Sequence, residues 1–337
     1  MNNDLLFIII EASIKSLILC IALLTAFAYS TWLERKFIAL IQQRIGPNTA
    51  GPAGLLHPVA DAIKLFLKEE VIPAQADKVM FVVAPIITGI PALIVLGATP
   101  FGPDIELFGR TIRLAVTDIN VGLLYFLGIA SIAVYGIVLA GWASESKYAT
   151  LGGMRSTAQM VSYEIALGLA IIGPVLAAGS LSMQDIVITQ QDTLWFVFTQ
   201  PVAAIIFYIA ALAEVNRAPF DMPEAEQELT AGYHTEYSGM KFGMFFMSEY
   251  IKMVAVSAIF ATLFLGGYDG PFVREVPLLG PLYIGLKIAA SIIFMIWLRG
   301  TLPRMRYDQL MDFGWKVMLP LALANVVVTA FFIAFVA

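Results

Sequence analysis

The sequence has few of the residues that build soluble surfaces and metal centres. Only 13% of its 337 residues are charged, and it has one cysteine and two histidines. A single cysteine excludes an internal disulfide and any Cys-ligated zinc or iron–sulfur cluster held by this chain alone. Both histidines, His57 and His234, fall in predicted loops, so no pair faces across spans to hold a haem. The net charge of −5 gives no indication of a nucleic-acid partner.

The common signatures of soluble catalysis are missing as well. The sequence has no Walker A motif, no G-x-G-x-x-G that opens a helix, no H-E-x-x-H and no Ser-His-Asp pattern in a suitable context. The chain by itself is therefore not expected to be a self-sufficient redox enzyme.

Apolar residues dominate what is present. They make up 59% of the chain, the mean hydropathy is +0.83, and they fall into blocks of the length that a bilayer requires, roughly 20 residues. Such blocks must be helical, because lipid offers no partner for backbone groups. We predict an all-α polytopic transmembrane bundle that forms one integral membrane domain over residues 1–337. The eight expected spans are Leu5–Trp32, Val79–Pro100, Ile119–Ala143, Ala158–Gly179, Trp195–Val215, Phe242–Gly266, Leu278–Leu298 and Trp315–Val336.

The distribution of lysine and arginine predicts the orientation. The loops after spans one, three, five and seven, with their flanks, hold 14 of the 20 Lys and Arg residues, whereas the opposite loops hold 3. The positive-inside rule places the first set in the cytoplasm. With eight spans, both termini are then expected outside.

The first cytoplasmic loop contains a predicted amphipathic helix, His57–Glu70. Val59, Ile63 and Phe66 follow helical spacing, and Asp61 lies on another stripe. We interpret it as a surface helix lying along the inner face of the bundle.

One charged group stands at the inner end of span one, at Glu34-Arg35-Lys36, and Arg44 follows it ahead of Gly46-Pro47. Two interpretations remain open from the residues alone. The group is a topological anchor followed by a turn, or Arg44 pairs with a neighbouring carboxylate or lines a cavity.

Other charges fall inside the spans. A carboxylate at Glu164 costs a few kcal/mol in a membrane unless it is neutral, paired or hydrated, roughly 2.5–3.5 kcal/mol at a span centre, so we expect it in a polar path. Glu249 and Lys252 are spaced i,i+3, and Glu11 and Lys15 are spaced i,i+4. The simpler alternative for both pairs is an ion pair that only holds helices.

The most informative segment follows span five. Between Glu214 and Glu236 lie six acids and one arginine, with Pro219 and Pro223 among them. The intervening residues are largely apolar, which indicates a loop that folds back against something. Closely spaced carboxylates there would couple their proton affinities, as a proton-loading site requires. The alternative is a calcium-binding or solvated acidic loop. The six acids are Glu214, Asp221, Glu224, Glu226, Glu228 and Glu236.

Two classes of function fit these features, a stand-alone ion-coupled transporter and a membrane component of a larger energy-converting complex. A lone transporter usually shows internal repeats with interrupted spans in both halves, and no clear repeat is present here. Broad, structured cytoplasmic loops instead favour a docking face for other proteins.

Long motifs along the whole chain then resemble one family, the H subunit of the proton-pumping NADH–quinone oxidoreductase, respiratory complex I. The departures are small: His57 stands where the family often has Gln, and Thr230 where it often has Val. The motifs are Leu33-Glu34-Arg35-Lys36, Gln43-Arg44-Ile45-Gly46-Pro47-Asn48, Gly141-Trp142-Ala143-Ser144, Ser146-Lys147-Tyr148, Ala158-Gln159, Ser162-Tyr163-Glu164, Ala213-Glu214, Asn216-Arg217, Pro219-Phe220-Asp221, Glu224-x-Glu226-x-Glu228-Leu229, Gly232-Tyr233, Glu236-Tyr237 and Arg304-Met305-Arg306-Tyr307-Asp308-Gln309-Leu310-Met311.

The resemblance implies roles for individual residues. A protein of this family helps to form the chamber where a quinone headgroup is reduced, and couples that reduction to proton translocation. By motif match, the residues that would line or support the quinone chamber are Arg35, Arg44, Asp61, Phe220 and Arg299. Those of the proton-linked path would be Glu34, Glu164, Glu214, Asp221, Glu224, Glu226, Glu228, Glu236 and Glu249.

The resemblance also implies partners. The chain would bind no cofactor itself, with quinone as substrate and with flavin and iron–sulfur clusters in partner subunits. Its partners would be the other membrane-arm and hydrophilic-arm subunits and the lipid of a bacterial cytoplasmic (inner) membrane. The alternative within this class is the homologous membrane subunit of a membrane-bound hydrogenase or of a ferredoxin- or deazaflavin-linked dehydrogenase. The acidic loop with its Gly-Tyr and Glu-Tyr pairs favours the NADH–quinone complex.

Overall fold

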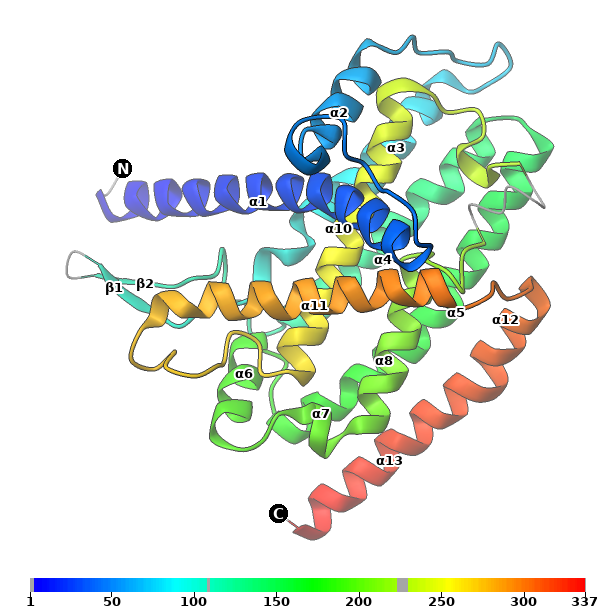
Figure 1. Ribbon diagram of the computed structural model, residues 1–337. Coiled ribbons are helices and arrows are strands. Elements are labelled where there is room, and N and C mark those ends of the chain that lie inside the picture. The colour runs from blue at the N-terminus through cyan, green and yellow to red at the C-terminus, as the bar shows by residue number, and fades with distance from the viewer. Residues whose placement is uncertain (1–2, 108–109, 223–229, 337) are drawn as a thin grey trace.

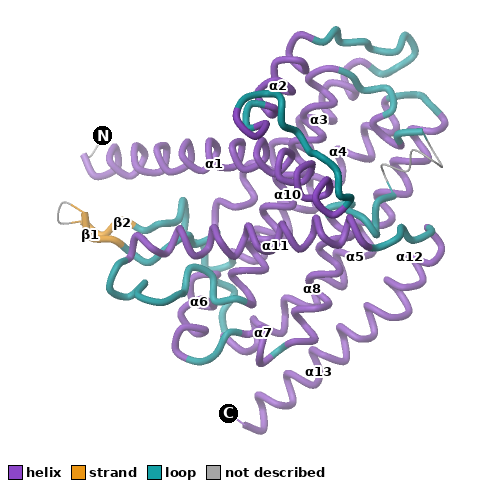
Figure 2. The backbone as a smooth tube through the Cα atoms, in the orientation of Figure 1, coloured by secondary structure: helices purple, strands orange, loops and turns teal. Residues whose placement is uncertain are grey.

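The computed structural model describes residues 3–107, 110–222 and 230–336. Within these ranges the chain is mainly helical, and its one sheet is a two-stranded antiparallel hairpin (Figure 2). Seven helices there are long and apolar enough to cross a membrane. The prediction of an all-α polytopic bundle is confirmed, with the small hairpin as an addition that the sequence did not indicate.

The elements follow one another along the chain as Figure 1 labels them. Short 3-10 helices lie at Pro52–Gly54, Val95–Ala98, Gly232–His234 and Pro277–Leu279, and a π-helix lies at Gly314–Met318. The longer elements are α1 (Asn3–Ile41), α2 (His57–Leu67), α3 (Lys78–Ile94), β1 (Ile105–Leu107), β2 (Arg110–Ile112), α4 (Gly122–Ala143), α5 (Lys147–Ala178), α6 (Met183–Asp192), α7 (Phe196–Thr199), α8 (Pro201–Glu214), α10 (Gly239–Phe264), α11 (Gly280–Thr301), α12 (Tyr307–Phe313) and α13 (Leu319–Val336).

Helix α10 forms the centre of the bundle, and α1 and α13 lie at opposite flanks (Figure 1). In the most apolar window of each helix, 67% of the residues of α10 are buried inside the chain, against 6% for α1 and 11% for α13. The two flanking helices therefore leave most of their surface to lipid or to neighbouring chains.

Helix α1 is longer than a bilayer is thick. Its 39 residues extend over about 58 Å at 1.5 Å per residue, about twice the hydrocarbon thickness. The helix continues past the expected end at Trp32, through Glu34 and Arg35, to Ile41. The charged residues do not end it because Glu34 is buried and paired, as described below.

Two other spans differ in detail from simple apolar blocks. Helix α5 begins at Lys147 rather than at Ala158, which places Glu164 near its middle. The fifth apolar block is broken into α7 and α8 at Gln200-Pro201, because proline donates no backbone hydrogen bond and disfavours a helical residue before it. The Gln200 amide joins this break to α5 by donating to the Gly173 carbonyl at 3.0 Å.

Glycines allow two close approaches that position the site. A Cβ on Gly136 of α4 would lie 2.8 Å from the Ala84 carbonyl oxygen of α3. A Cβ on Gly152 of α5 would lie 2.6 Å from the Cα of Gly232. Small residues let backbones meet in membrane bundles, and the second contact seats the 3-10 helix Gly232–His234 on α5.

Candidate functional site

A buried carboxylate, Glu34 of α1, lies at the centre of a charged cluster. Its Oε1 accepts a hydrogen bond from Arg217 Nη1 at 3.1 Å and another from Arg299 Nη1 of α11. Its Oε2 accepts one from the Tyr250 hydroxyl of α10 at 2.6 Å. Only 5% of the Glu34 side chain is exposed. Its hydrogen bonds connect α1 to α10, to α11 and to the turn at Arg217. Glu34 is therefore a buried, paired carboxylate and not a solvated charge that only anchors the end of a span.

Arg217 is the second member of this cluster, and its position follows from how α8 ends. Asn216 adopts a left-handed conformation (φ 56°), which asparagine tolerates. The Arg217 N–H then donates to the Leu212 carbonyl, and the Asn216 N–H to the Ala213 carbonyl. This pair of bonds is a Schellman motif, which reverses the chain and satisfies the last carbonyls of the helix. The turn directs Arg217 back into the bundle.

A glutamine of α5 braces the same turn. The Gln159 amide nitrogen lies within hydrogen-bond distance of the Ala213 carbonyl (2.7 Å), the Phe220 carbonyl (2.6 Å) and Asn216 Oδ1 (3.2 Å). Gln159 is fully buried, so its bonds to two backbone carbonyls fix the turn in a place where water cannot replace them.

The cluster is balanced in charge. Arg217 Nε lies 2.9 Å from Glu249 Oε1, and the guanidinium carbon lies 4.3 Å from the centre of the Tyr250 ring. Burial lowers the pKa of Arg217, but attraction to Glu249 and Glu34 more than offsets it, so the pKa is raised well above its ordinary value. Two guanidinium groups, those of Arg217 and Arg299, thus face the carboxylates of Glu34 and Glu249. Buried charges need such pairing, because an unpaired buried charge strongly destabilises a protein.

On another side of α1, Arg35 faces a hollow. Arg35 Nη1 lies 2.9 Å from Asp61 Oδ2 of α2 and contacts the His57 ring. Arg35 and Arg44 line an open hollow of about 500 Å³ together with residues 45–49. The structure therefore brings together three predicted chamber residues, Arg35, Arg44 and Asp61.

The amphipathic helix is present as α2, and it ends at Leu67 rather than at Glu70. Its apolar stripe is exposed, with 53% of Val59, 54% of Ile63 and 70% of Phe66 accessible. The helix uses Asp61 to contact α1, and the stripe faces away from the chain. We expected a surface helix along the inner face of the bundle. Helix α2 does lie at the surface, and its place on the inner side of the membrane stays a prediction.

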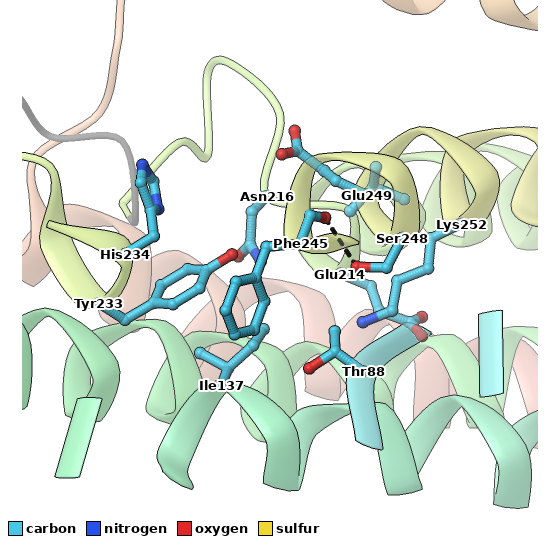
Figure 3. Close-up of a pocket in the computed structure, with 11 residues that line it drawn as sticks. Thr88, Ile137, Glu214, Asn216, Tyr233, His234, Phe245, Ser248, Glu249 and Lys252 are labelled. Atoms are coloured by element: carbon cyan, nitrogen blue, oxygen red, sulfur yellow. Dashed lines mark hydrogen bonds between the residues drawn. The ribbon is translucent and has the colours of Figure 1, made fainter. Parts of the chain in front are cut away.

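A small polar cavity lies between α3, α4, α8 and α10 (Figure 3). Its volume is about 20 Å³, and Glu214, Glu249 and Lys252 line it along with Thr88 and Ser248. Glu214 is buried, and its Oε2 has no hydrogen-bond partner among the described residues. The charge of Glu164 on α5 acts on Glu214. Glu164 itself accepts a hydrogen bond from the Ser131 hydroxyl of α4.

A model of the NADH dehydrogenase protein family matches residues 14–330. The NADH-quinone oxidoreductase H subunit numbered 2 in Geobacter sulfurreducens is 50% identical over 337 residues, covering 100% of both chains. The H subunit of Thermomicrobium roseum is 51% identical, covering 95% of each chain, and the one numbered 2 in Syntrophobacter fumaroxidans is 52% identical, covering 93% of each.

The chain belongs to the H-subunit family of NADH–quinone oxidoreductases. The resemblance drawn from the motifs is confirmed, and the interpretation as a complex I subunit is supported over a hydrogenase subunit or a stand-alone transporter. An H subunit is a membrane component of an NADH:quinone oxidoreductase, and the several apolar helices agree with this.

Not every family motif residue lies where its predicted role would place it. Phe220 is 4% exposed and packs between Tyr163 and Phe313, at ring distances of 5.5 and 6.4 Å. It lines neither the hollow at Arg35 nor the small gap beside Glu34. Its role in the quinone chamber stays a prediction.

The described residues include only the two ends of the acidic loop between α8 and α10. Asp221 is half-buried just before the gap in the described ranges, and Glu236 is half-buried just after it. Beside Glu236, Tyr237 stacks on Phe81 with ring centres 4.0 Å apart, and burial raises the pKa of Tyr237 above its usual value. The predicted path residues Glu224, Glu226 and Glu228 lie outside the described residues.

Sequence spacing gave an incomplete account of one pair and identified another. Glu249 also pairs with Arg217, because a turn distant in sequence brings a guanidinium within 2.9 Å of it. Glu11 and Lys15 do form the expected pair, at 2.5 Å.

Three positions in these clusters were given no role from sequence: Arg217, Gln159 and Tyr250. Arg217 had a signal, since it is the one arginine among six acids. Gln159 had none beyond the family motif and Tyr250 had none at all, because their roles depend on which helices meet.

Proposed function

We propose that this chain forms part of the wall of a quinone chamber and the beginning of a proton-linked path in a proton-translocating NADH–quinone oxidoreductase. The observation that carries the proposal is the adjacency of Glu34 and Arg35 on α1. Consecutive residues of a helix point about 100° apart, at 3.6 residues per turn. Arg35 faces the open hollow, whereas Glu34 enters the buried cluster.

The hollow suits the headgroup of a quinone. Reduction of a quinone adds two electrons and takes up two protons, so negative charge develops before the protons arrive. Arg35 and Arg44 are cations placed beside this hollow, and Asp61 holds Arg35 in position at 2.9 Å. The exposed apolar stripe of α2 suits contact with the isoprenoid tail or with lipid. Within this proposal, electrons reach the quinone from flavin and iron–sulfur clusters in partner subunits, and the chain holds no cofactor itself.

A change of charge at the hollow changes the electrostatic potential at the buried cluster around Glu34. Charges separated by low-dielectric protein interact much more strongly than charges in water. Glu34 links through Arg217 to Glu249, which lines the polar cavity with Glu214. The proposed path therefore runs through the carboxylates of Glu34, Glu249, Glu214 and Glu164. The acidic loop, with Glu224, Glu226, Glu228 and Glu236, would supply this path with protons.

The setting proposed for the chain is a bacterial cytoplasmic membrane, with both termini on the periplasmic side. The excess of Lys and Arg in one set of loops supports this orientation. Its partners are the other membrane-arm and hydrophilic-arm subunits, and the lipid. A reporter enzyme that is active only in the periplasm should be active when fused after residue 337.

The quinone assignment is tested by Arg35→Met in the assembled complex. We expect the KM for a short-chain quinone to rise severalfold, because a cation that meets the headgroup is lost. Lys64→Met is the matched control, since Lys64 lies on the exposed face of α2. An unchanged KM in Arg35→Met would contradict the chamber assignment.

The path is tested by Glu214→Gln and Glu236→Gln in inverted membrane vesicles, with quinone reduction and proton uptake measured together. We expect fewer protons moved per quinone reduced, or a parallel loss of both. Glu275→Gln in the exposed loop before α11 is the control. Normal reduction with normal pumping in both variants would remove these carboxylates from the coupling.

A further inference from the structure

Two small cavities inside the bundle share two side chains. The polar cavity described above and a second cavity of about 10 Å³ are both lined by Glu214 of α8 and Lys252 of α10. Among the described residues, no other is common to the two linings. Glu214 and Lys252 therefore form the junction between them, and Figure 3 shows both side chains reaching into the same part of the polar cavity.

The two cavities differ in what they can hold. The polar cavity has room for about one water, which needs roughly 10–15 Å³ and two or more polar partners. Apart from the shared pair, the second cavity is lined by apolar side chains and a proline, such as Pro91, Phe126 and Val256. Water is favoured on one side of the junction and disfavoured on the other, so a proton crossing it must be held by a side chain.

Glu214 is built to hold that proton. Its Oε2 is buried without a hydrogen-bond partner among the described residues. A buried carboxylate oxygen is stable when it is protonated, hydrated or next to a cation. The polar cavity offers the water, and Lys252 offers the cation.

The net charge at the junction can be neutralised by one proton. Glu214 and Glu164 are the carboxylates that act on Lys252 from α8 and α5, and Glu249 acts on it from its own helix. Glu249 is already opposed by Arg217. One ammonium facing two remaining carboxylates gives a net charge of −1, which a single added proton would neutralise.

We propose that Lys252 is a positioning residue for proton transfer, and that its ammonium keeps Glu214 ionised and ready to accept a proton from the polar cavity. When Glu214 takes the proton, the junction becomes neutral and its attraction to Lys252 is lost. The proton can then pass toward Glu164 and the ammonium again faces an ionised carboxylate. Lys252 keeps its own protons throughout, so it acts through Glu214.

This proposal rests on the proposed proton-linked path, and the experiment separates the two. The variants Lys252→Met, Glu214→Gln and the double variant are made in the complete complex. In membrane vesicles we measure assembled complex on native gels, quinone reduction, proton uptake, and the infrared band of protonated carboxyl groups on reduction.

In Lys252→Met we expect pumping to fall severalfold per quinone reduced. Glu214 would be neutral before reduction, so the redox-linked carboxyl band that Glu214→Gln removes should also be lost. Where Lys252→Met assembles poorly, the double variant removes both charges and should restore assembly without restoring pumping. A purely structural balance of the two charges predicts that the double variant restores both, and that result would overturn the proposal.

Lys15→Met is the matched control, because Lys15 is also a lysine in a span with a glutamate close by, Glu11, but on the flanking helix α1. It should pump normally, and a loss equal to that of Lys252→Met would show that the effect is not specific to the junction. Normal pumping and an unchanged band in Lys252→Met, with a defect in Glu214→Gln, would overturn the role of Lys252 alone. Normal pumping in Glu214→Gln would remove the path through this residue.

Discussion

Glu34 and Arg217 form a hydrogen-bonded ion pair of 3.1 Å that joins the first helix to the turn after α8. Each side chain is only 5% exposed, and each has a second partner of opposite charge, Arg299 for Glu34 and Glu249 for Arg217. Through Glu249, which lines the polar cavity, the pair is connected to that cavity. Its buried, balanced charges make it the part of the site most sensitive to substitution.

Arg217→Met should strongly destabilise the protein. Removing one partner of a buried ion pair leaves an uncompensated charge and costs about 3–5 kcal/mol. We expect little assembled complex on native gels and proportionally little quinone reductase activity. Because the pKa of Arg217 is raised, the guanidinium is charged at every pH at which the complex is assayed, so changing the pH should not reproduce the defect in the wild type.

Arg306→Met is the control for that variant. Arg306 pairs with Asp308 on the surface, where both side chains are more than half exposed, and exposed pairs contribute little. Assembly should stay normal. Equal losses in the two arginine variants would contradict the distinction between the buried and the exposed pair.

Gly152→Ala should displace the 3-10 helix that follows the acidic loop. The added Cβ would lie 2.6 Å from the Cα of Gly232, and backbone cannot yield as a side chain can. We expect a lower unfolding temperature of the purified complex and a reduced rate of quinone reduction. Gly168→Ala on the same helix has nothing within 4 Å of its Cβ, so it should be tolerated. Similar behaviour of both variants would argue against this contact.

Gln159→Leu tests the brace on the turn that carries Arg217. The Ala213 and Phe220 carbonyls would lose their side-chain donor in a buried place, at a cost of about 1–3 kcal/mol. We expect lower stability together with lower activity per assembled complex, because Arg217 is no longer fixed.

Gln190→Leu is the comparison for Gln159→Leu. Gln190 makes the same kind of brace between α6 and α10, donating to the Thr262 carbonyl at 2.9 Å. It should lose stability but keep its activity per assembled complex. The brace at Gln159 would have no functional role if both glutamine variants kept full specific activity.

Lys287→Met should affect stability alone. The Lys287 ammonium donates to three carbonyls after α10, those of Leu265, Gly267 and Asp269, at 2.6–2.8 Å. Cations near a helix C-terminus are stabilising, by roughly 0.3–1 kcal/mol, up to about 2 when partly buried. The unfolding temperature should fall while quinone reduction per assembled complex stays unchanged. A specific loss of activity would place this end of α10 in the coupling.

The apolar blocks predicted the fold class because a membrane leaves few alternatives to helices. They did not predict how far helices extend past them. Helix α1 continues through Glu34, since that carboxylate finds its partners in α10, α11 and the turn at Arg217. The break at Gln200 had a local signal in Pro201, whereas the early start of α5 at Lys147 had none in an apolar pattern.

Part of the site was predictable, because a charged side chain inside a membrane is costly unless it is paired, hydrated or neutral. Glu164 was identified as a candidate on that ground, Glu214 from the acidic segment that it begins, and Glu34 by the family motif. Arg217 was not identified as a partner of Glu34 and Glu249, because it lies on a turn distant in sequence from both. Long-range pairing of this kind depends on which helices meet.

The turn at the end of α8 has a consequence for how the protein varies. Glu214 is the last residue of that helix, and Arg217, three positions later, donates one of the two Schellman bonds. One short piece of rigid backbone therefore holds both the proton junction and the buried ion pair. Substitutions in the two clusters should be strongly epistatic, because residues that share a backbone element do not have additive effects. A change tolerated in one relative at Lys252 need not be tolerated in another that differs around Arg217.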